Sequence, residues 1–180
     1  GVVWNVATVK PLVQVPTTEA DEIHGYAGSD TLVGLGGNDL IRGNAGDDTL
    51  VGGLGNDNLA GGAGSDVYIF NAGDGQDVIN NHDAGAGRTD SLRFGPGILP
   101  TNVLVRRTGD SLVLTFAGSD DRVTISNYFY NDAAGAWRLD EIRFDDGTIW
   151  DVTVVRQMAL SPTSGNDVIQ GYATNDTITG

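Results

Sequence analysis

The sequence predicts an all-β protein: a parallel β-roll, which is a form of β-helix or solenoid, capped by an antiparallel β-rich flank. Three observations support this prediction. An aspartate recurs every nine residues from Asp21 to Asp66, and a large apolar residue follows each one by two positions. Glycine is concentrated in the same part of the chain, with 17 of the 27 glycines between Gly25 and Gly87. After residue 103 the composition changes to strands and tight turns.

Five consecutive nonapeptides keep the pattern well, and internal repeats of this kind indicate a solenoid. They read GYAGSDTLV from Gly25, GLGGNDLIR from Gly34, GNAGDDTLV from Gly43, GGLGNDNLA from Gly52 and GGAGSDVYI from Gly61.

Less regular copies surround these five. PTTEADEIH, from Pro16, keeps the aspartate and the apolar position but lacks the glycines. AGDGQDVIN from Ala72 is shifted by two residues, and GAGRTDSLR from Gly85 follows a further insertion. The period returns near the end of the chain, where Asp167 and Asp176 are again nine residues apart. A flexible acidic linker is disfavoured, because linkers do not keep an apolar residue in phase with aspartate over six repeats.

Each nonapeptide can be divided into a six-residue turn and a three-residue strand. We expect the first and fourth glycines to permit positive φ, the aspartate at position six to close the loop, and the apolar residue at position eight to point inward. Two nonapeptides then make one coil. Aspartates in adjacent coils stack roughly 4.8 Å apart, in one row with Asp30, Asp48 and Asp66 and another with Asp21, Asp39 and Asp57.

Stacked carboxylates oppose folding of the bare roll. Two of them at this spacing repel by about 3–4 kcal/mol at an effective dielectric constant of about 20. A three-residue strand buries one large side chain, worth roughly 1.5–3 kcal/mol, whereas ordering each residue costs about 1–2 kcal/mol. We therefore expect the roll to need a divalent cation. Ca²⁺ accepts six to eight mixed carbonyl and carboxylate oxygens, while Mg²⁺ demands a smaller octahedron and should substitute poorly.

The repeats resemble those of the RTX (repeats in toxin) haemolysin-type calcium-binding family, whose nonapeptide reads GGxGxDxUx, with U a large apolar residue. The resemblance covers about 16–92 and 163–180. It implies several bound Ca²⁺ ions. In that family each ion is held by the position-two and position-four carbonyls and the aspartate of one loop. The loop two repeats later adds its position-one and position-three carbonyls and its own aspartate.

Carried onto this sequence, the resemblance implies three central ions and two further sites. The first ion would contact Tyr26, Gly28, Asp30, Gly43, Ala45 and Asp48; the second Leu35, Gly37, Asp39, Gly52, Leu54 and Asp57; the third Asn44, Gly46, Asp48, Gly61, Ala63 and Asp66. A fourth site would join Gly53, Gly55 and Asp57 to Ala72, Asp74 and Asp77. A weaker one, in which the first loop lacks glycines, would join Thr17, Glu19 and Asp21 to Gly34, Gly36 and Asp39.

The flank predicts two hairpins and one further strand. NVLVRR and SLVLTFAG pair around TGD, DRVTISNYF follows as a strand, and RLDEIRF and TIWDV pair around DDG. YIFNAGDGQD, LRFGPGI and EIRFDDGTIW resemble the region that often follows RTX repeats. We expect residues 1–15 to form a capping strand, 16–92 the roll, 93–158 the flank that caps it, and 159–180 a linker and the start of a second repeat block.

Aromatic residues supply the bulk that an open roll needs at its ends. At the C-terminal end these are Tyr68, Phe70, Phe94, Phe129, Trp137, Phe144 and Trp150. Trp4 is the expected plug at the other end. Alternatively, a sugar- or protein-binding platform would use Tyr128, Phe129, Tyr130, Trp137 and Trp150.

Composition restricts the function. The formal charge of -14 repels nucleic acids and anionic lipids and favours cations. Cysteine is absent, which excludes disulfides and thiolate metal sites. No apolar run is long enough to span a membrane, and residues 1–15 do not read as a signal peptide. Hydrolase, zinc-protease and phosphate-loop motifs are missing, and His24 and His82 are expected to be surface residues.

These features predict a calcium-binding module, not itself an enzyme, of a secreted or cell-surface bacterial protein. RTX proteins usually leave the cell by type I secretion, and we expect this chain to fold on meeting Ca²⁺ outside. Its expected partners are calcium ions and further repeat blocks of the same chain; a protein or glycan partner is left open. Two alternatives remain: a calcium-rigidified unit of a giant adhesin, or a module appended to a secreted protease, lipase or polysaccharide-modifying enzyme.

Overall fold

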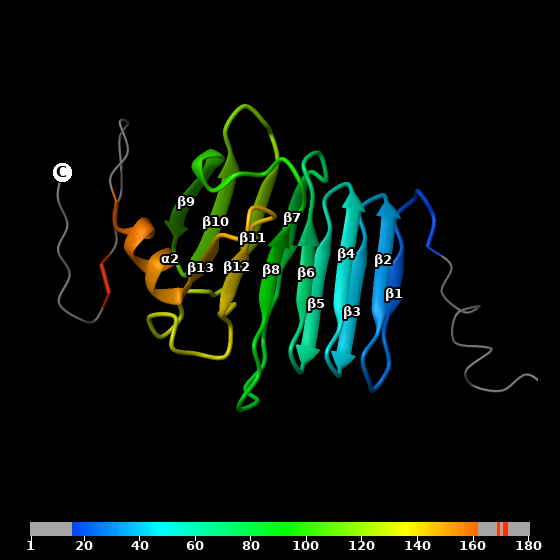
Figure 1. The fold of residues 1–180 in the computed structure, drawn as a ribbon. Helices are drawn as coiled ribbons and strands as arrows, with labels where there is room; N and C mark the ends of the chain where they lie inside the picture. Colours follow the sequence, from blue (N-terminus) through cyan, green and yellow to red (C-terminus); the bar gives the residue numbers. More distant parts are fainter. Residues whose placement is uncertain (1–15, 162–168, 170, 173–180) are drawn as a thin grey trace, which may run out of the picture.

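The repeats fold into short strands that alternate between two parallel sheets. A computed structural model describes residues 16–161, 169, 171 and 172. The coils follow one another along one axis from the N-terminal end, and the flank closes the opposite end (Figure 1). To the first sheet the repeats contribute β1 (Glu22–His24), β3 (Leu40–Ala45), β5 (Asn58–Ala63) and β7 (Gln76–Ile79). The second holds β2 (Thr31–Gly36), β4 (Thr49–Leu54), β6 (Val67–Phe70) and β8 (Ser91–Phe94).

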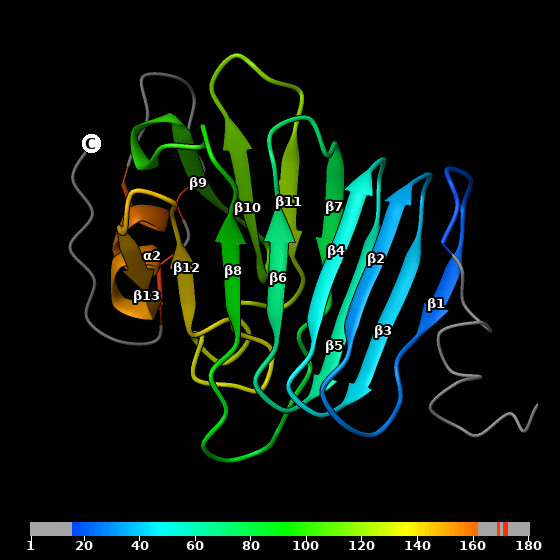
Figure 2. The same ribbon diagram turned by 45° about the vertical axis from the view of Figure 1, so that its right-hand side comes forward.

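The register confirms a coil of two nonapeptides. Leu32 pairs with Leu50, and Ile41 pairs with Leu59, so each strand pairs with the strand two repeats later. The irregular repeats do not break the ladder, because β7 still pairs with β5 and β8 with β6 despite the extra residues between them. The insertions therefore lie in the loops (Figure 2).

The apolar residue at position eight of each repeat points between the two sheets, as the alternation of strand side chains predicts. None of these residues is more than 9% exposed. They are Ile23, Leu32, Ile41, Leu50, Leu59, Tyr68, Ile79 and Leu92.

Two details of the repeat differ from the sequence prediction. The central strands have six residues instead of three, because the glycine half of the repeat also pairs with the next coil, as Leu35 does with Gly53. Positive φ occurs at positions two and four, not one and four. Position four is always glycine there, whereas position two tolerates Leu35 (φ 77°) and Asn44 (φ 79°).

The flank continues both sheets before it closes them. β9 (Val103–Thr108) and β10 (Ser111–Phe116) form the first predicted hairpin, after a 3-10 turn at Pro100–Asn102, and β12 (Glu141–Arg143) and β13 (Ile149–Asp151) form the second. β11 (Arg122–Ile125) lies antiparallel to β10 and parallel to β7, and β12 lies parallel to β8. The parallel ladder of the roll thus extends by one coil into the flank.

A short helix, α2 (Val152–Ala159), was not predicted from the sequence. The Asp151 side chain caps it by accepting a hydrogen bond from the Val154 N–H at 2.9 Å. Val155 and Ala159 lie one turn apart and are buried, and the helix packs on β9 and β13. Among the described residues, no helix is long and apolar enough to cross a membrane.

Aromatic side chains fill the space between roll and flank. The Phe70 ring stacks on Phe116 at 5.3 Å between ring centroids, and Phe94 packs against Phe116 and Phe144. Of the alternative platform, Tyr128, Phe129 and Trp150 are buried in the core, Trp137 is half-buried against His82, and Tyr130 is exposed. These positions support the capping interpretation. Trp4, Asp167 and Asp176 lie outside the described residues.

The beginning of the last repeat contacts the flank. The guanidinium groups of Arg107 and Arg156 both approach the Tyr172 ring, at 5.3 and 4.3 Å from its centroid. Its hydroxyl donates to the Arg156 carbonyl at 3.1 Å, and Arg107 donates to the Gly171 carbonyl at 3.3 Å. Residues far apart in the sequence are thereby held on one side of the cap.

Candidate metal sites between the stacked loops

The repeat aspartates form two continuous rows along the edges of the roll. In each row the backbone N–H of one aspartate donates a hydrogen bond to Oδ1 of the aspartate in the next coil, at 2.8 to 3.0 Å. The predicted stacking is therefore present in both rows; its continuation from Asp57 to Asp77 was expected in the fourth site, whereas the step from Asp66 to Asp90 was not predicted. One contains Asp21, Asp39, Asp57 and Asp77, and the other Asp30, Asp48, Asp66 and Asp90.

The second carboxylate oxygen has no protein partner in the middle of both rows. Oδ2 is buried and accepts no hydrogen bond in Asp39, Asp48, Asp57 and Asp66. An ionised carboxylate is costly to bury unless its oxygens are paired or bind a metal. Four equivalent oxygens left in this state by a regular repeat therefore fit a site built for cations.

The first glycine of each repeat makes room for this oxygen. A Cβ at Gly34 would overlap Oδ2 of Asp39 and the carbonyl oxygen of Gly52. Gly43 stands in the same relation to Asp48 and the carbonyl of Gly61. Position one is therefore glycine because of close approach, and not because of its backbone angle as the sequence suggested.

The residue at position four of the repeat must be glycine for two reasons, its positive φ and the close approach of the neighbouring coil. It has positive φ at Gly37 and Gly55, and a Cβ at Gly55 would overlap the carbonyl oxygen of Gly37 in the preceding coil. Loop carbonyls and aspartate carboxylates therefore gather in the narrow space between successive loops. Hard oxygen donors of both kinds are what Ca²⁺ prefers.

Burial shifts the titration of these carboxyls. Loss of hydration, with a contribution from neighbouring carboxylates, raises the pKa of Asp57 to about 6 and the pKa values of Asp66 and Asp77 to about 7. The same loss of hydration raises the pKa values of Asp48 and Asp74. Asp66 and Asp77 therefore resist ionisation near neutral pH, and a cation between the loops would relieve this resistance.

The first coil differs from the central ones. Oδ2 of Asp21 accepts hydrogen bonds from the Thr17 N–H and hydroxyl at 2.7 and 3.0 Å, and Oδ2 of Asp30 accepts from the Tyr26 N–H at 2.6 Å. The loop that lacks glycines thus satisfies its aspartate internally. The weaker site expected at Asp21 stays a prediction, and the Tyr26–Asp30 bond lies within the first of the three predicted central sites.

The carbonyls predicted at position three already hold one hydrogen bond each. Those of Ala45, Leu54, Ala63 and Asp74 accept from the N–H of the position-four glycine one coil earlier, at 2.6 to 2.9 Å. Each carbonyl oxygen retains a second lone pair. The Asp74 side chain is turned instead toward the Asn71 N–H, at 2.7 Å.

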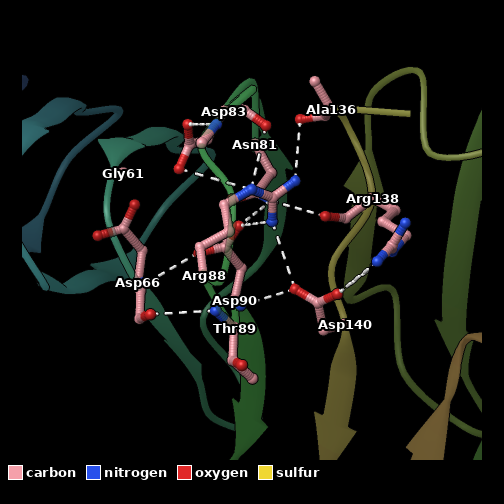
Figure 3. A network of polar contacts seen from close by, with 12 residues as sticks. Gly61, Asp66, Asn81, Asp83, Arg88, Thr89, Asp90, Ala136, Arg138 and Asp140 are labelled. Carbon is pink, nitrogen blue, oxygen red and sulfur yellow. Dashed lines mark hydrogen bonds and ion pairs between the residues drawn. The ribbon is translucent and has the colours of Figure 1, made fainter. Parts of the chain in front are cut away.

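Asp140 continues the second row beyond Asp90, and this residue was not predicted from the sequence. The N–H of Asp90 donates to Oδ2 of Asp140 at 3.0 Å, so the row continues into the flank (Figure 3). The signal was available, because GAWRLDEIR from Gly135 matches GAGRTDSLR from Gly85 at positions one, two, four, six and nine. It was overlooked because the segment was interpreted only as half of a hairpin.

Comparison with known proteins agrees with this geometry. The model of a haemolysin-type calcium binding protein related domain matches residues 112–154. The model of the RTX calcium-binding nonapeptide repeat matches four times, at residues 17–41, 33–68, 42–79 and 163–180. The chain carries RTX calcium-binding repeats.

Relatives of the RTX module include a much longer protein. The iron-regulated protein FrpA of Neisseria meningitidis serogroup C is 40% identical over 111 residues, which is 62% of this chain and 10% of FrpA. The solution structure of the AlgE6R3 subunit of the Azotobacter vinelandii mannuronan C5-epimerase matches with a TM-score of 0.50 and 25% identity. That match covers 92% of this chain and 95% of the subunit. Extracellular lipase LipA of Serratia marcescens matches at a TM-score of 0.31 and 26% identity, over 56% of this chain and 17% of LipA.

RTX loops differ from sites built from side chains alone. Among the residues that the structure describes, no three His, Asp or Glu side chains gather so as to hold a metal. Each pair of successive loops offers two carboxylates, and any ion between them must take backbone carbonyls as its remaining ligands. Sequence reasoning from charged residues alone would therefore overlook these sites.

Proposed function

We propose that this chain is the calcium-dependent module of a protein that acts outside the cell, and that its roll folds as Ca²⁺ enters between successive loops. The observation that supports the proposal is the set of buried Oδ2 atoms without a partner in Asp39, Asp48, Asp57 and Asp66. These oxygens and the facing carbonyls would hold the ions. The bound metal supplies positive charge where the fold buries negative charge.

The ligand sets given by the RTX resemblance stay our proposal for the individual ions. The central loops, which include Asp48 and Asp57, have the strongest support because their Oδ2 atoms are free of protein donors. The first coil has less, because Thr17 and Tyr26 already donate to Asp21 and Asp30. We therefore expect affinity to fall toward the N-terminal end of the roll.

The direct test is far-UV circular dichroism of the chain in EDTA and in millimolar Ca²⁺. We expect loss of β-structure in EDTA and cooperative recovery with Ca²⁺, and we expect Mg²⁺ at the same concentration to restore little because it demands a smaller octahedral shell. An identical folded spectrum in EDTA would refute calcium-dependent folding.

A structural role in a longer protein is a second candidate. The RTX model matches again at 163–180, and Gly171 and Tyr172 lie against the cap of the roll. Several calcium-loaded rolls joined in this way would form a stiff stalk. Small-angle scattering of a longer chain with the following repeats should show an extended rod in Ca²⁺ and a flexible coil in EDTA; a flexible chain in both would reject the stalk.

Attachment to a secreted enzyme remains a third candidate, in which catalysis would belong to another domain. We expect the isolated chain to give no turnover on esters, peptides or alginate-like polymers. Robust turnover on any of them would show that the module is itself catalytic.

A further inference from the structure

We propose that Arg88 is a built-in cation that takes the place of a calcium ion between the loops of Asp90 and Asp140, so that the last coil of the roll closes without metal. The inference rests on the proposed function, because it assigns one inter-loop position to a side chain and the others to Ca²⁺.

The strongest support is a comparison within one row. Asp66 and Asp90 occupy the same repeat position, and Oδ1 of each accepts the N–H of the preceding aspartate at 2.9 Å. Oδ2 of Asp66 is buried without a partner. Oδ2 of Asp90 instead accepts from Asn81 Nδ2 at 2.7 Å and from Arg88 Nη1. The requirement for a positive charge is thus met by a protein side chain at Asp90, whereas it stays open at Asp66.

The surroundings of Arg88 contain the kinds of oxygen proposed for calcium. Its Nη1 contacts the carboxylates of two successive loops, Asp90 and Asp140, the latter at 3.3 Å. Its Nε donates to the Asp83 carbonyl at 3.0 Å, and Nη2 donates to the Ala136 carbonyl at 3.3 Å. Figure 3 shows the guanidinium in the middle of these groups.

The side chain is held in the interior. It is only 10% exposed, and Asp90 is fully buried. Arginine stays charged in proteins, and its planar group can bridge carboxylates as a fixed fork. A buried charge with several partners of this kind does not exchange with solvent ions as a surface pair would.

Arginine at position four also changes the backbone conformation of its loop. Arg88 and Arg138 both occupy position four, where every earlier loop from Gly28 to Gly75 has glycine with positive φ; neither arginine has positive φ. Arg138 Nη2 donates to Oδ1 of Asp140 at 3.0 Å, so that carboxylate also has a protein cation. The last coil therefore departs from the calcium-loop conformation as well as from its charge pattern.

We therefore expect one part of the fold to stay folded without metal and another part to require it. β8 and β12, which flank this coil, should stay paired in EDTA, whereas β2 to β5 should open. Amide hydrogen exchange of the full chain in EDTA, read by mass spectrometry on peptides from each region, measures this directly. We expect protection in β8 and β12 of the wild-type chain and none in β2 to β5. Loss of protection in both regions would overturn the role of Arg88 while leaving calcium-dependent folding intact.

Arg88→Gln is the deciding variant. Removing one partner of a buried ion pair leaves a charge uncompensated, so β8 and β12 should exchange about a hundredfold faster in EDTA, and millimolar Ca²⁺ should restore their protection. Arg143→Gln is the matched control, since Arg143 lies in β12 but pairs with Glu141 near the surface. Equal protection in the wild type and Arg88→Gln would contradict the proposal.

A charge-balanced variant guards against simple misfolding. Arg88→Gln combined with Asp140→Asn removes one positive and one negative group, and we expect it to recover at least about tenfold of the lost protection in EDTA. No recovery would mean that Arg88 acts through packing instead of charge. Protection of β2 to β5 in EDTA would be a different result, because it would refute the proposed function itself.

Discussion

The backbone N–H of Asp48 donates a 2.9 Å hydrogen bond to Oδ1 of Asp66, one coil later, while Oδ2 of Asp66 is buried without a partner. One oxygen of the carboxylate thus joins two coils, and the other remains for a cation. Because both tasks fall on the same side chain, coil stacking and ion binding should occur together.

Asp48→Asn should weaken calcium-dependent folding. Asparagine can still accept the bond from the Asp30 N–H, but it removes the charge that two proposed ions share. We expect the Ca²⁺ concentration at the folding midpoint to rise at least about tenfold. A dichroism-monitored Ca²⁺ titration measures it. Asp145→Asn, at an exposed turn, is the control and should leave the midpoint unchanged; equal midpoints in both variants would contradict the role of Asp48.

Gly34→Ala should be far more harmful than Gly36→Ala, two residues away. A Cβ at position 34 overlaps Oδ2 of Asp39 and the Gly52 carbonyl, whereas at position 36 its nearest neighbour is the Leu54 carbonyl at 3.6 Å. We expect Gly34→Ala to lower the free energy of unfolding in Ca²⁺ by about 1–3 kcal/mol. Thermal unfolding of both variants checks this, and equal melting temperatures would refute the close-approach explanation.

Leu50→Ala should separate core packing from ion binding. Leu50 is fully buried between the sheets, whereas Leu54 in the same strand is 63% exposed. Truncating the buried side chain should cost about 2–5 kcal/mol and raise the Ca²⁺ midpoint, although no ligand is lost. Leu54→Ala should have little effect on either quantity. A large effect of Leu54→Ala would show that this loop side chain has a structural role.

The calcium requirement should depend on pH. Burial raises the pKa of Asp57 from 3.8 to about 6 and that of Asp66 from 3.8 to about 7. At pH values between the ordinary pKa of 3.8 and these raised values, the folded roll therefore binds more protons than the unfolded chain. Its free energy of unfolding in EDTA should therefore fall as the pH rises from about 4 to about 7. We expect more β-structure in EDTA at about pH 5 than at about pH 7.5. Equal amounts of β-structure in EDTA at the two pH values, measured by far-UV circular dichroism, would contradict this expectation.

Most of the fold could be predicted from the nine-residue period of the sequence. It places Leu32, Leu50 and the other position-eight residues in the core, and the register of the coils follows from pairing alternate repeats. The partnerless state of Oδ2 could not be predicted, since it depends on where the neighbouring coil places its N–H groups. The role of Arg88 was hidden for the same reason, because Asp140 meets it from a distant part of the sequence. Helix α2 was missed because its short apolar stripe only becomes decisive when β9 and β13 are in place.

The most direct test of ion binding between the loops is a crystal structure grown in millimolar Ca²⁺, with anomalous scattering used to locate the ions. We predict Ca²⁺ within about 2.3–2.6 Å of Oδ2 of Asp48 and Asp57, with loop carbonyls completing each shell, and no ion between Asp90 and Asp140. Ordered loops with no cation beside Asp48 and Asp57 at that concentration would contradict the central claim.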